Sequence, residues 1–124
     1  MKYLATGLFA IVVLGSCQRS PDQVRVFKDP SGQYQYLVST YLGTGPVSSD
    51  YTRIFVTASD DNNAAPTLVA SGDYLSVSKV EFVGGYSAVL CKAGGKLDRY
   101  RPVVKLMISG ASIPVRSKID ANCH

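Results

Sequence analysis

The chain has 124 residues, of which 46% are hydrophobic and 18% charged, and its formal net charge is +4. This length suits a single domain, and the hydrophobic fraction is too high for a disordered chain. Eleven glycines and six prolines exclude a long coiled coil, and the absence of a Gly-x-y period excludes a collagen-like repeat.

The first elements of the chain predict export. Lys2 gives a positive start and is followed by an unbroken apolar run over residues 8–14. The run is much shorter than the about 20 apolar residues that a membrane-spanning helix needs. A charged start, a short apolar core and small residues behind it are typical of an export signal, which we place at residues 1–16.

The apolar run is followed by Leu14-Gly15-Ser16-Cys17. This motif resembles the lipobox of bacterial lipoproteins. The resemblance implies that the chain is cut before Cys17, that the Cys17 thiol is diacylated and that the protein is anchored in the cell envelope. In Gram-negative lipoproteins an Asp after the lipidated Cys holds the protein at the inner membrane, so Gln18 implies the outer membrane, facing the periplasm. The alternatives are an ordinary secretory signal with a chance Cys near the cut, or a chance apolar N-terminus.

Residues 17–23 follow as the lipidated Cys and a short polar tether, and residues 24–124 as a single domain. No stretch of that domain has the 3.6-residue period of a helix. Apolar residues instead alternate between turn signals, which predicts strands over residues 24–28, 33–42, 51–58, 67–70, 74–83, 86–93, 101–108 and 113–120. The fold class is therefore all-β, as a small antiparallel sandwich or barrel of about seven or eight strands.

Three local features refine the strands. Leu75 and Val77 share one parity whereas Val80 and Phe82 share the other, so we expect a bulge near Ser78-Lys79. Gly84-Gly85 predicts a two-residue hairpin turn. Pro102 has no N–H to donate and must lie at the start of its strand or on an edge.

The cysteines support an oxidising compartment. If Cys17 carries lipid, Cys91 and Cys123 remain and can form a disulfide. The alternative is a zinc site made by these two thiols and His124, which lacks a fourth ligand and the usual short spacing.

The motifs for catalysis are weak. The single histidine is the terminal His124, a poor general base, so schemes that need a His have no candidate. Ser76-Val77-Ser78-Lys79 fits the Ser-x-x-Lys pattern, but a strand points the first and last residues to opposite faces unless a bulge intervenes. A small hydrolase acting without His, through a carboxylate in a cleft at Glu81, Asp73 or Asp98, is the alternative class.

Ligand motifs are weak too. In the segment 91–96, a phosphate loop would need Gly at position 90, where this chain has Leu90. The acidic loop Asp60-Asp61-Asn62-Asn63 lacks the central Gly of a calcium loop. We therefore expect no catalytic residue, cofactor or metal.

Charge and aromatic residues indicate a binding surface. Residues 79–124 carry eight basic and three acidic side chains, a balance of +5, whereas residues 17–78 balance at −2. An anionic partner would meet five cations that fall within 14 positions: Lys92, Lys96, Arg99, Arg101 and Lys105. Tyr34 and Tyr36 share one strand face, and Tyr is common at protein interfaces. Solvated lysines and half-buried strand tyrosines are the plainer explanations.

The sequence thus predicts a non-enzymatic binding module, held at the membrane by its lipid and engaging a protein partner rather than nucleic acid. It would be an inhibitor or immunity lipoprotein, or an accessory subunit of a secretion, conjugation or exclusion system. Lipid-anchored β-rich lysozyme inhibitors are similar in size and architecture. Their Ser-Gly-x-x-Tyr signature is not reproduced, because Ser31-Gly32-Gln33-Tyr34 and Ser71-Gly72-Asp73-Tyr74 are each one residue short. No inhibitory residue is therefore carried over.

Overall fold

The computed structural model describes residues 20–43, 50–59 and 65–123. The predicted export signal, Cys17, the acidic loop 60–63 and His124 lie outside these residues. In the described part of the chain every regular element is a β-strand, which confirms the all-β class.

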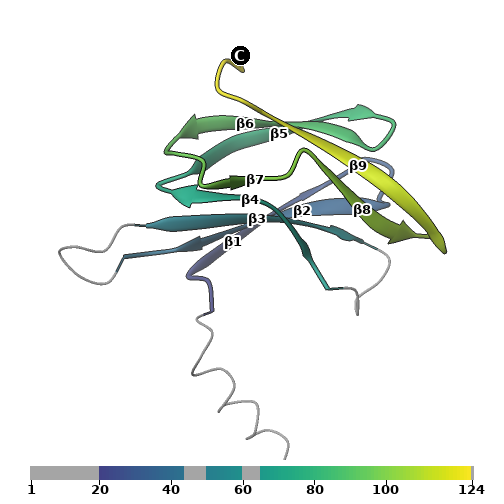
Figure 1. The fold of residues 1–124 in the computed structure, drawn as a ribbon, viewed down its shortest axis with the longest axis horizontal. Coiled ribbons are helices and arrows are strands. Elements are labelled where there is room, and N and C mark those ends of the chain that lie inside the picture. The colour runs from purple at the N-terminus through teal and green to yellow at the C-terminus, as the bar shows by residue number, and fades with distance from the viewer. Residues whose placement is uncertain (1–19, 44–49, 60–64, 124) are drawn as a thin grey trace, which may run out of the picture.

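Two sheets stack face to face as a β-sandwich (Figure 1). The first has the order β1-β2-β3-β4-β7, with bounds Gln23–Lys28, Tyr34–Tyr41, Tyr51–Ala58, Thr67–Asp73 and Arg99–Tyr100. The second has the order β5-β6-β9-β8, with bounds Ser76–Gly84, Ser87–Gly94, Ala111–Asp120 and Val103–Ile108. Neighbouring strands are antiparallel, except that β6 and β9 pair in parallel.

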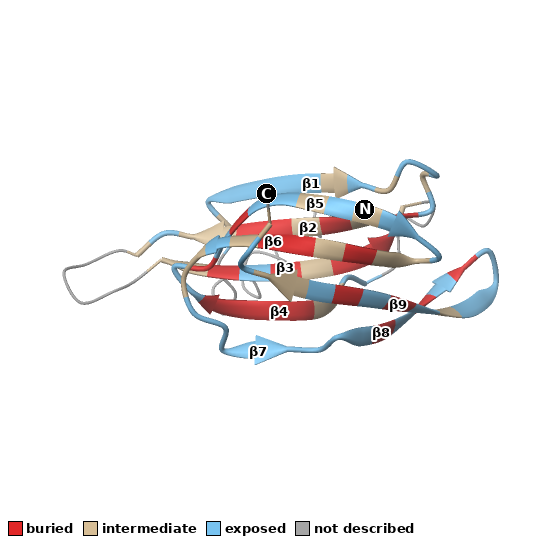
Figure 2. Cartoon of the chain, turned by 90° about the horizontal axis from the view of Figure 1, so that it is seen from above, coloured by how far each residue is buried: buried red, intermediate tan, exposed pale blue. Residues whose placement is uncertain are grey.

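The core lies between the sheets and follows from the period-2 alternation of apolar residues. In β2 and β3 the inward residues include Tyr36 and Ile54, both fully buried. Leu90 on β6 and Val115 on β9 meet them from the other sheet and are also fully buried. Figure 2 shows the resulting stripes of buried and exposed residues along the strands.

The two open sides of the sandwich are closed differently. On one side Arg25 of β1 reaches the second sheet, where its Nη1 donates to the Val77 carbonyl at 2.7 Å. On the other side the chain itself crosses between the sheets after β7. There the Arg101 amide donates to the Val69 carbonyl at 2.7 Å, and the Ser117 amide donates to the Pro102 carbonyl at 2.8 Å.

Most predicted strands are present, and the differences have local causes. The strand expected over residues 101–108 begins only after Pro102, as β8, which is consistent with the missing N–H of that proline. The short β7 was not predicted, and it joins the first sheet whereas β8 belongs to the second. Residues 71–73, expected to turn, extend β4 instead because they pair with β3 and receive hydrogen bonds from residues 96 and 98.

The bulge expected near Ser78-Lys79 is confirmed, because the register of β5 on β6 jumps from Val77–Lys92 to Lys79–Cys91. The hairpin turn was predicted one residue too early. Gly84 still pairs with Ser87, and the turn residues are Gly85 and Tyr86.

Candidate partner-binding surface

Tyr34 and Tyr36 are not available to a partner, so this part of the predicted surface is wrong. Both lie on one face of β2, as their spacing predicted, but that face is the inner one, and their exposed fractions are 2% and 0%. The hydroxyls of Tyr36 and Ser117 are 2.6 Å apart and join the two sheets. Burial raises the pKa of Tyr36 to about 12, so its hydroxyl stays protonated at neutral pH.

Four of the five predicted cations do come together with two others. We call this surface the basic edge; it comprises six exposed side chains, Lys96, Arg99, Arg101, Lys105, Arg116 and Lys118. Between residues 96 and 118 Asp98 is the one acidic side chain, so the formal net charge of this segment is +5. Lys92 does not join the basic edge, because it is half-buried and shares the strand parity of the buried Ala88 and Leu90.

Backbone pairing explains how the basic edge is assembled. The segment before β7 runs along β4, where the Lys96 amide donates to the Asp73 carbonyl and the Asp98 amide to the Ser71 carbonyl. Further along, Arg116 of β9 lies directly opposite Val103 of β8. Cross-strand partners share a face of the sheet, so these two side chains point outward together.

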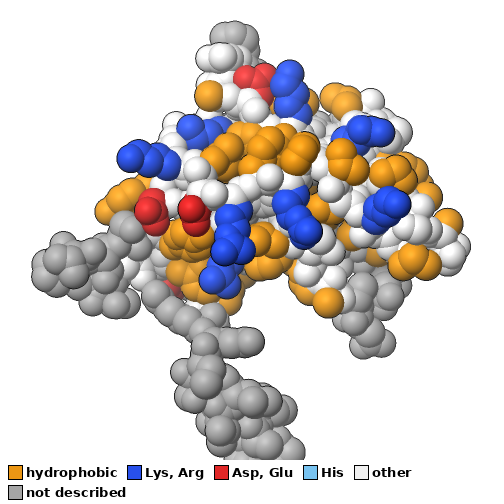
Figure 3. All heavy atoms as spheres, in the orientation of Figure 1, with side chains coloured by type: hydrophobic (Ala, Val, Ile, Leu, Met, Phe, Trp, Pro, Cys, Tyr) orange, Lys and Arg blue, Asp and Glu red, His pale blue; other side chains and the backbone are white. Residues whose placement is uncertain are grey.

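An apolar hollow of about 400 Å³ lies within this surface. Its apolar lining includes Val83, Tyr100 and Val103, whose exposed fractions are 64%, 39% and 44%. Arg116 and Lys118 line it as well. In Figure 3, Lys and Arg side chains surround a patch of hydrophobic side chains on the face that carries β7 and β8. The Tyr100 hydroxyl donates to the Ser117 carbonyl at 2.6 Å, which holds the ring in place.

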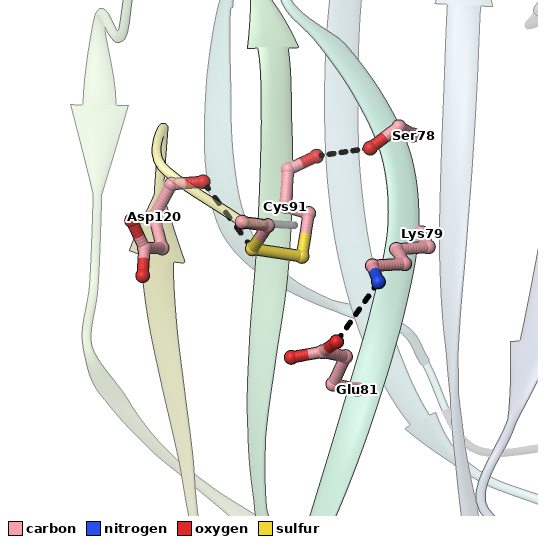
Figure 4. A network of polar contacts seen from close by, with 6 residues as sticks. Ser78, Lys79, Glu81, Cys91 and Asp120 are labelled. Atoms are coloured by element: carbon pink, nitrogen blue, oxygen red, sulfur yellow. Dashed lines mark hydrogen bonds and ion pairs between the residues drawn. A yellow bond between two sulfur atoms is a disulfide. The ribbon is translucent and has the colours of Figure 1, made fainter.

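The six cations of the basic edge have no acidic partner among the described residues. The ion pair within that part of the chain joins Lys79 to Glu81, at 3.0 Å, on the outer face of β5 (Figure 4). Asp98, the nearest carboxylate in sequence, accepts a hydrogen bond from the Tyr51 hydroxyl at 3.2 Å. The positive charge of the basic edge is therefore uncompensated within the described structure.

Of the carboxylates suggested for a hydrolase, one lies in a hollow. Asp98 lines a space of about 250 Å³ together with Tyr51, Ser71, Arg53 and Arg99. No second carboxylate lines that space, so it offers no acid–base pair. Glu81 is about half exposed and is engaged by Lys79.

The predicted disulfide is present. Cys91 and Cys123 are bonded, with their Cα atoms 5.6 Å apart, and the bond ties the C-terminal segment to β6 (Figure 4). The Glu81 carboxylate lies within 4.8 Å of both sulfur atoms. Because the sulfurs are bonded to each other, they offer no thiolate, and the zinc alternative loses two of its three ligands.

Sequence reasoning missed two members of the basic edge, although their signal was in the chain. Arg116 and Lys118 alternate with Val115 and Ser117 in the most regular strand pattern of the protein. That alternation places them on one outer face, but it does not say which strands lie beside them. The pairing of β9 with β8 and the hydrogen bond from the Ser117 amide to the Pro102 carbonyl decide this.

Comparison with protein families, with curated proteins and with solved structures found no match to this chain. None of the described residues forms a helix long and apolar enough to cross a membrane.

Proposed function

We propose that this protein is a lipid-anchored binding module of the cell envelope that holds an acidic protein partner through the basic edge. The observation that carries the proposal is the set of six exposed cations, without acidic partners in the described structure, around an apolar hollow. In this role the protein is an inhibitor, an immunity protein or an accessory subunit, and not an enzyme.

The composition of the surface supports a protein as the partner. Protein interfaces have an apolar centre with a polar rim, and they are enriched in Tyr and Arg. The hollow at Tyr100, Pro102 and Val103 provides the centre, and the surrounding Lys and Arg side chains provide the rim. Uncompensated rim charges accelerate association with an oppositely charged partner and make it sensitive to salt.

Charge reversal tests the surface. Replacing Lys96, Arg99 and Arg101 together by Glu changes the local charge by six units, and we expect partner capture from envelope extract to fall at least tenfold. Wild-type capture should weaken as salt is raised. Lys28→Glu, an exposed cation of β1 outside the basic edge, is the control and should bind as the wild type does. A triple variant that retains full binding contradicts the proposal.

The membrane anchor has a separate test. A single acyl chain holds a protein only marginally, whereas two or three anchor it stably. Cys17→Ser should therefore move the protein from the membrane fraction to the soluble fraction, without changing the melting temperature of the domain. Unchanged fractionation, or mass spectrometry that finds an intact Met1, would contradict lipidation.

A further inference from the structure

A second hollow, of about 400 Å³, lies away from the basic edge. It is formed where the turn after β1 meets the turn between β5 and β6, and both turns lie at the same end of the sandwich (Figures 1 and 2). One side is lined by Asp29, Pro30, Ser31, Gln33 and Tyr34, and the other by Phe82, Gly84, Gly85 and Tyr86. No residue of the basic edge lines it.

Three aromatic rings, with Pro30, form the apolar part of its lining. The ring centroid of Tyr34 lies 5.7 Å from that of Phe82 and 5.8 Å from that of Tyr86. Tyr86 reaches this position from a left-handed backbone, with φ at 59°, which a non-glycine residue adopts only at a conformational cost. Its hydroxyl donates to Gln33 Oε1, so the ring is held across the two turns.

The Tyr34 ring lines the hollow, but its hydroxyl does not reach the accessible surface. The hydroxyl is buried and, alone among the buried side-chain N and O atoms of the described residues, has no hydrogen-bond partner. Such groups are costly and normally satisfied, as Tyr36 is by Ser117. Burial first, and the nearby Tyr36, Asp29 and Tyr86 after it, raise the pKa of Tyr34 beyond its usual range. A molecule in the hollow therefore meets the uncharged Tyr34 ring and not the hydroxyl.

The formal charge of the lining is negative. Asp29 is its one ionisable carboxylate, and neither Lys nor Arg lines the hollow. Asp29 Oδ2 accepts hydrogen bonds from the Ser31 amide, at 2.9 Å, and from the Ser31 hydroxyl. Its Oδ1 accepts none from the described residues. A carboxylate beside aromatic rings attracts cations and repels anions.

We propose that this hollow binds a small organic cation, a primary ammonium carried on an apolar group. The ammonium donates to Asp29, while the apolar group packs against Phe82 and Tyr86. The site is independent of the basic edge, whose charge would select partners of the opposite sign.

The test uses the full chain with 2-phenylethylammonium as the probe, followed by the amide signals of Gly84, Gly85 and Tyr86 in NMR titrations. We expect saturable shifts that are confined to residues around the hollow. The neutral 2-phenylethanol should bind at least tenfold more weakly, and the anionic phenylacetate should leave the signals unchanged. Absence of saturable shifts with the ammonium, or equal binding of the three probes, overturns the proposal.

Two variants separate the carboxylate from the buried hydroxyl without removing an aromatic ring. Asp29→Asn keeps the turn but removes the charge, and it should weaken binding of 2-phenylethylammonium roughly tenfold, the usual effect of losing one hydrogen bond to a charged group. Tyr34→Phe removes only the buried hydroxyl and should bind as the wild type does. Asp98→Asn, a carboxylate outside the hollow, should also bind as the wild type does. Unchanged binding by Asp29→Asn overturns the proposal.

Discussion

Tyr34 and Tyr36 lie two residues apart on β2 and point the same way, yet their hydroxyls are in opposite situations. The Tyr36 hydroxyl contacts Ser117 across the core, whereas the Tyr34 hydroxyl has no partner among the described residues. An unpaired buried polar group costs about 1–3 kcal/mol, and so does removing one partner of a buried pair. We therefore expect the two Tyr→Phe replacements to change the free energy of unfolding differently.

Tyr36→Phe should lower the free energy of unfolding by about 1–3 kcal/mol, because it leaves the buried Ser117 hydroxyl without its partner. Tyr34→Phe should leave the free energy of unfolding unchanged or raise it, since the variant keeps the ring and loses only an unpaired oxygen. Urea denaturation of both variants at neutral pH and without added ligand measures the difference. Equal destabilisation of the two would mean that the Tyr34 hydroxyl has a partner in solution.

At the scale of elements, β4 and the segment before β7 depend on one glycine. A Cβ added at Gly72 would lie 1.7 Å from the Lys96 carbonyl oxygen and 2.8 Å from its carbonyl carbon. Gly72 thus permits the close approach that lets residues 96–98 bond to β4 and carry part of the basic edge.

Gly72→Ala should therefore lower the free energy of unfolding by at least about 2 kcal/mol, because backbone atoms must move apart to admit the methyl group. Gly94→Ala is the matched control, since a Cβ there meets no atom within 4 Å. It should remain within about 0.5 kcal/mol of the wild type. If thermal or urea denaturation shows no difference between the two variants, the close contact at Gly72 is wrong.

At the scale of the whole molecule, the disulfide links the segment after β9 to β6 of the second sheet. Cys91 and Cys123 are separated by 32 positions, so the bond closes a loop of 33 residues. On the chain-entropy account, a loop of that length stabilises the folded state by about 3.7 kcal/mol. The bond matters to a domain of this size because its core is small.

The double variant Cys91→Ala/Cys123→Ala should accordingly melt well below the oxidised wild type. A reductant should lower the melting temperature of the wild type to that of the variant and leave the variant itself unchanged. A reductant that has no effect on the wild type would show that the bond does not form in solution.

Most of the strands, the bulge at Ser78 and the pairing of the cysteines could be predicted from the chain alone. So could the shared face of Tyr34 and Tyr36 on β2, but not that this face is the inner one. The strands and the bulge follow from the alternation of neighbouring residues and from turn residues. The cysteine pairing follows from the number of cysteines left after Cys17. The residues of the basic edge were predicted only in part. Lys92 has the inward parity of its strand, and Arg116 and Lys118 join because β9 lies beside β8 and the segment at Pro102.

Local pattern therefore determined that this chain forms strands, and its N-terminal motif carries the expectation of a lipid anchor. The tertiary structure alone decided which faces are free. The alternation of β2 says that Tyr34 and Tyr36 point together, but only the second sheet, packed against them, makes that face the core. The same holds for both hollows, because each is lined by segments that are distant in sequence and brought together by packing between the sheets.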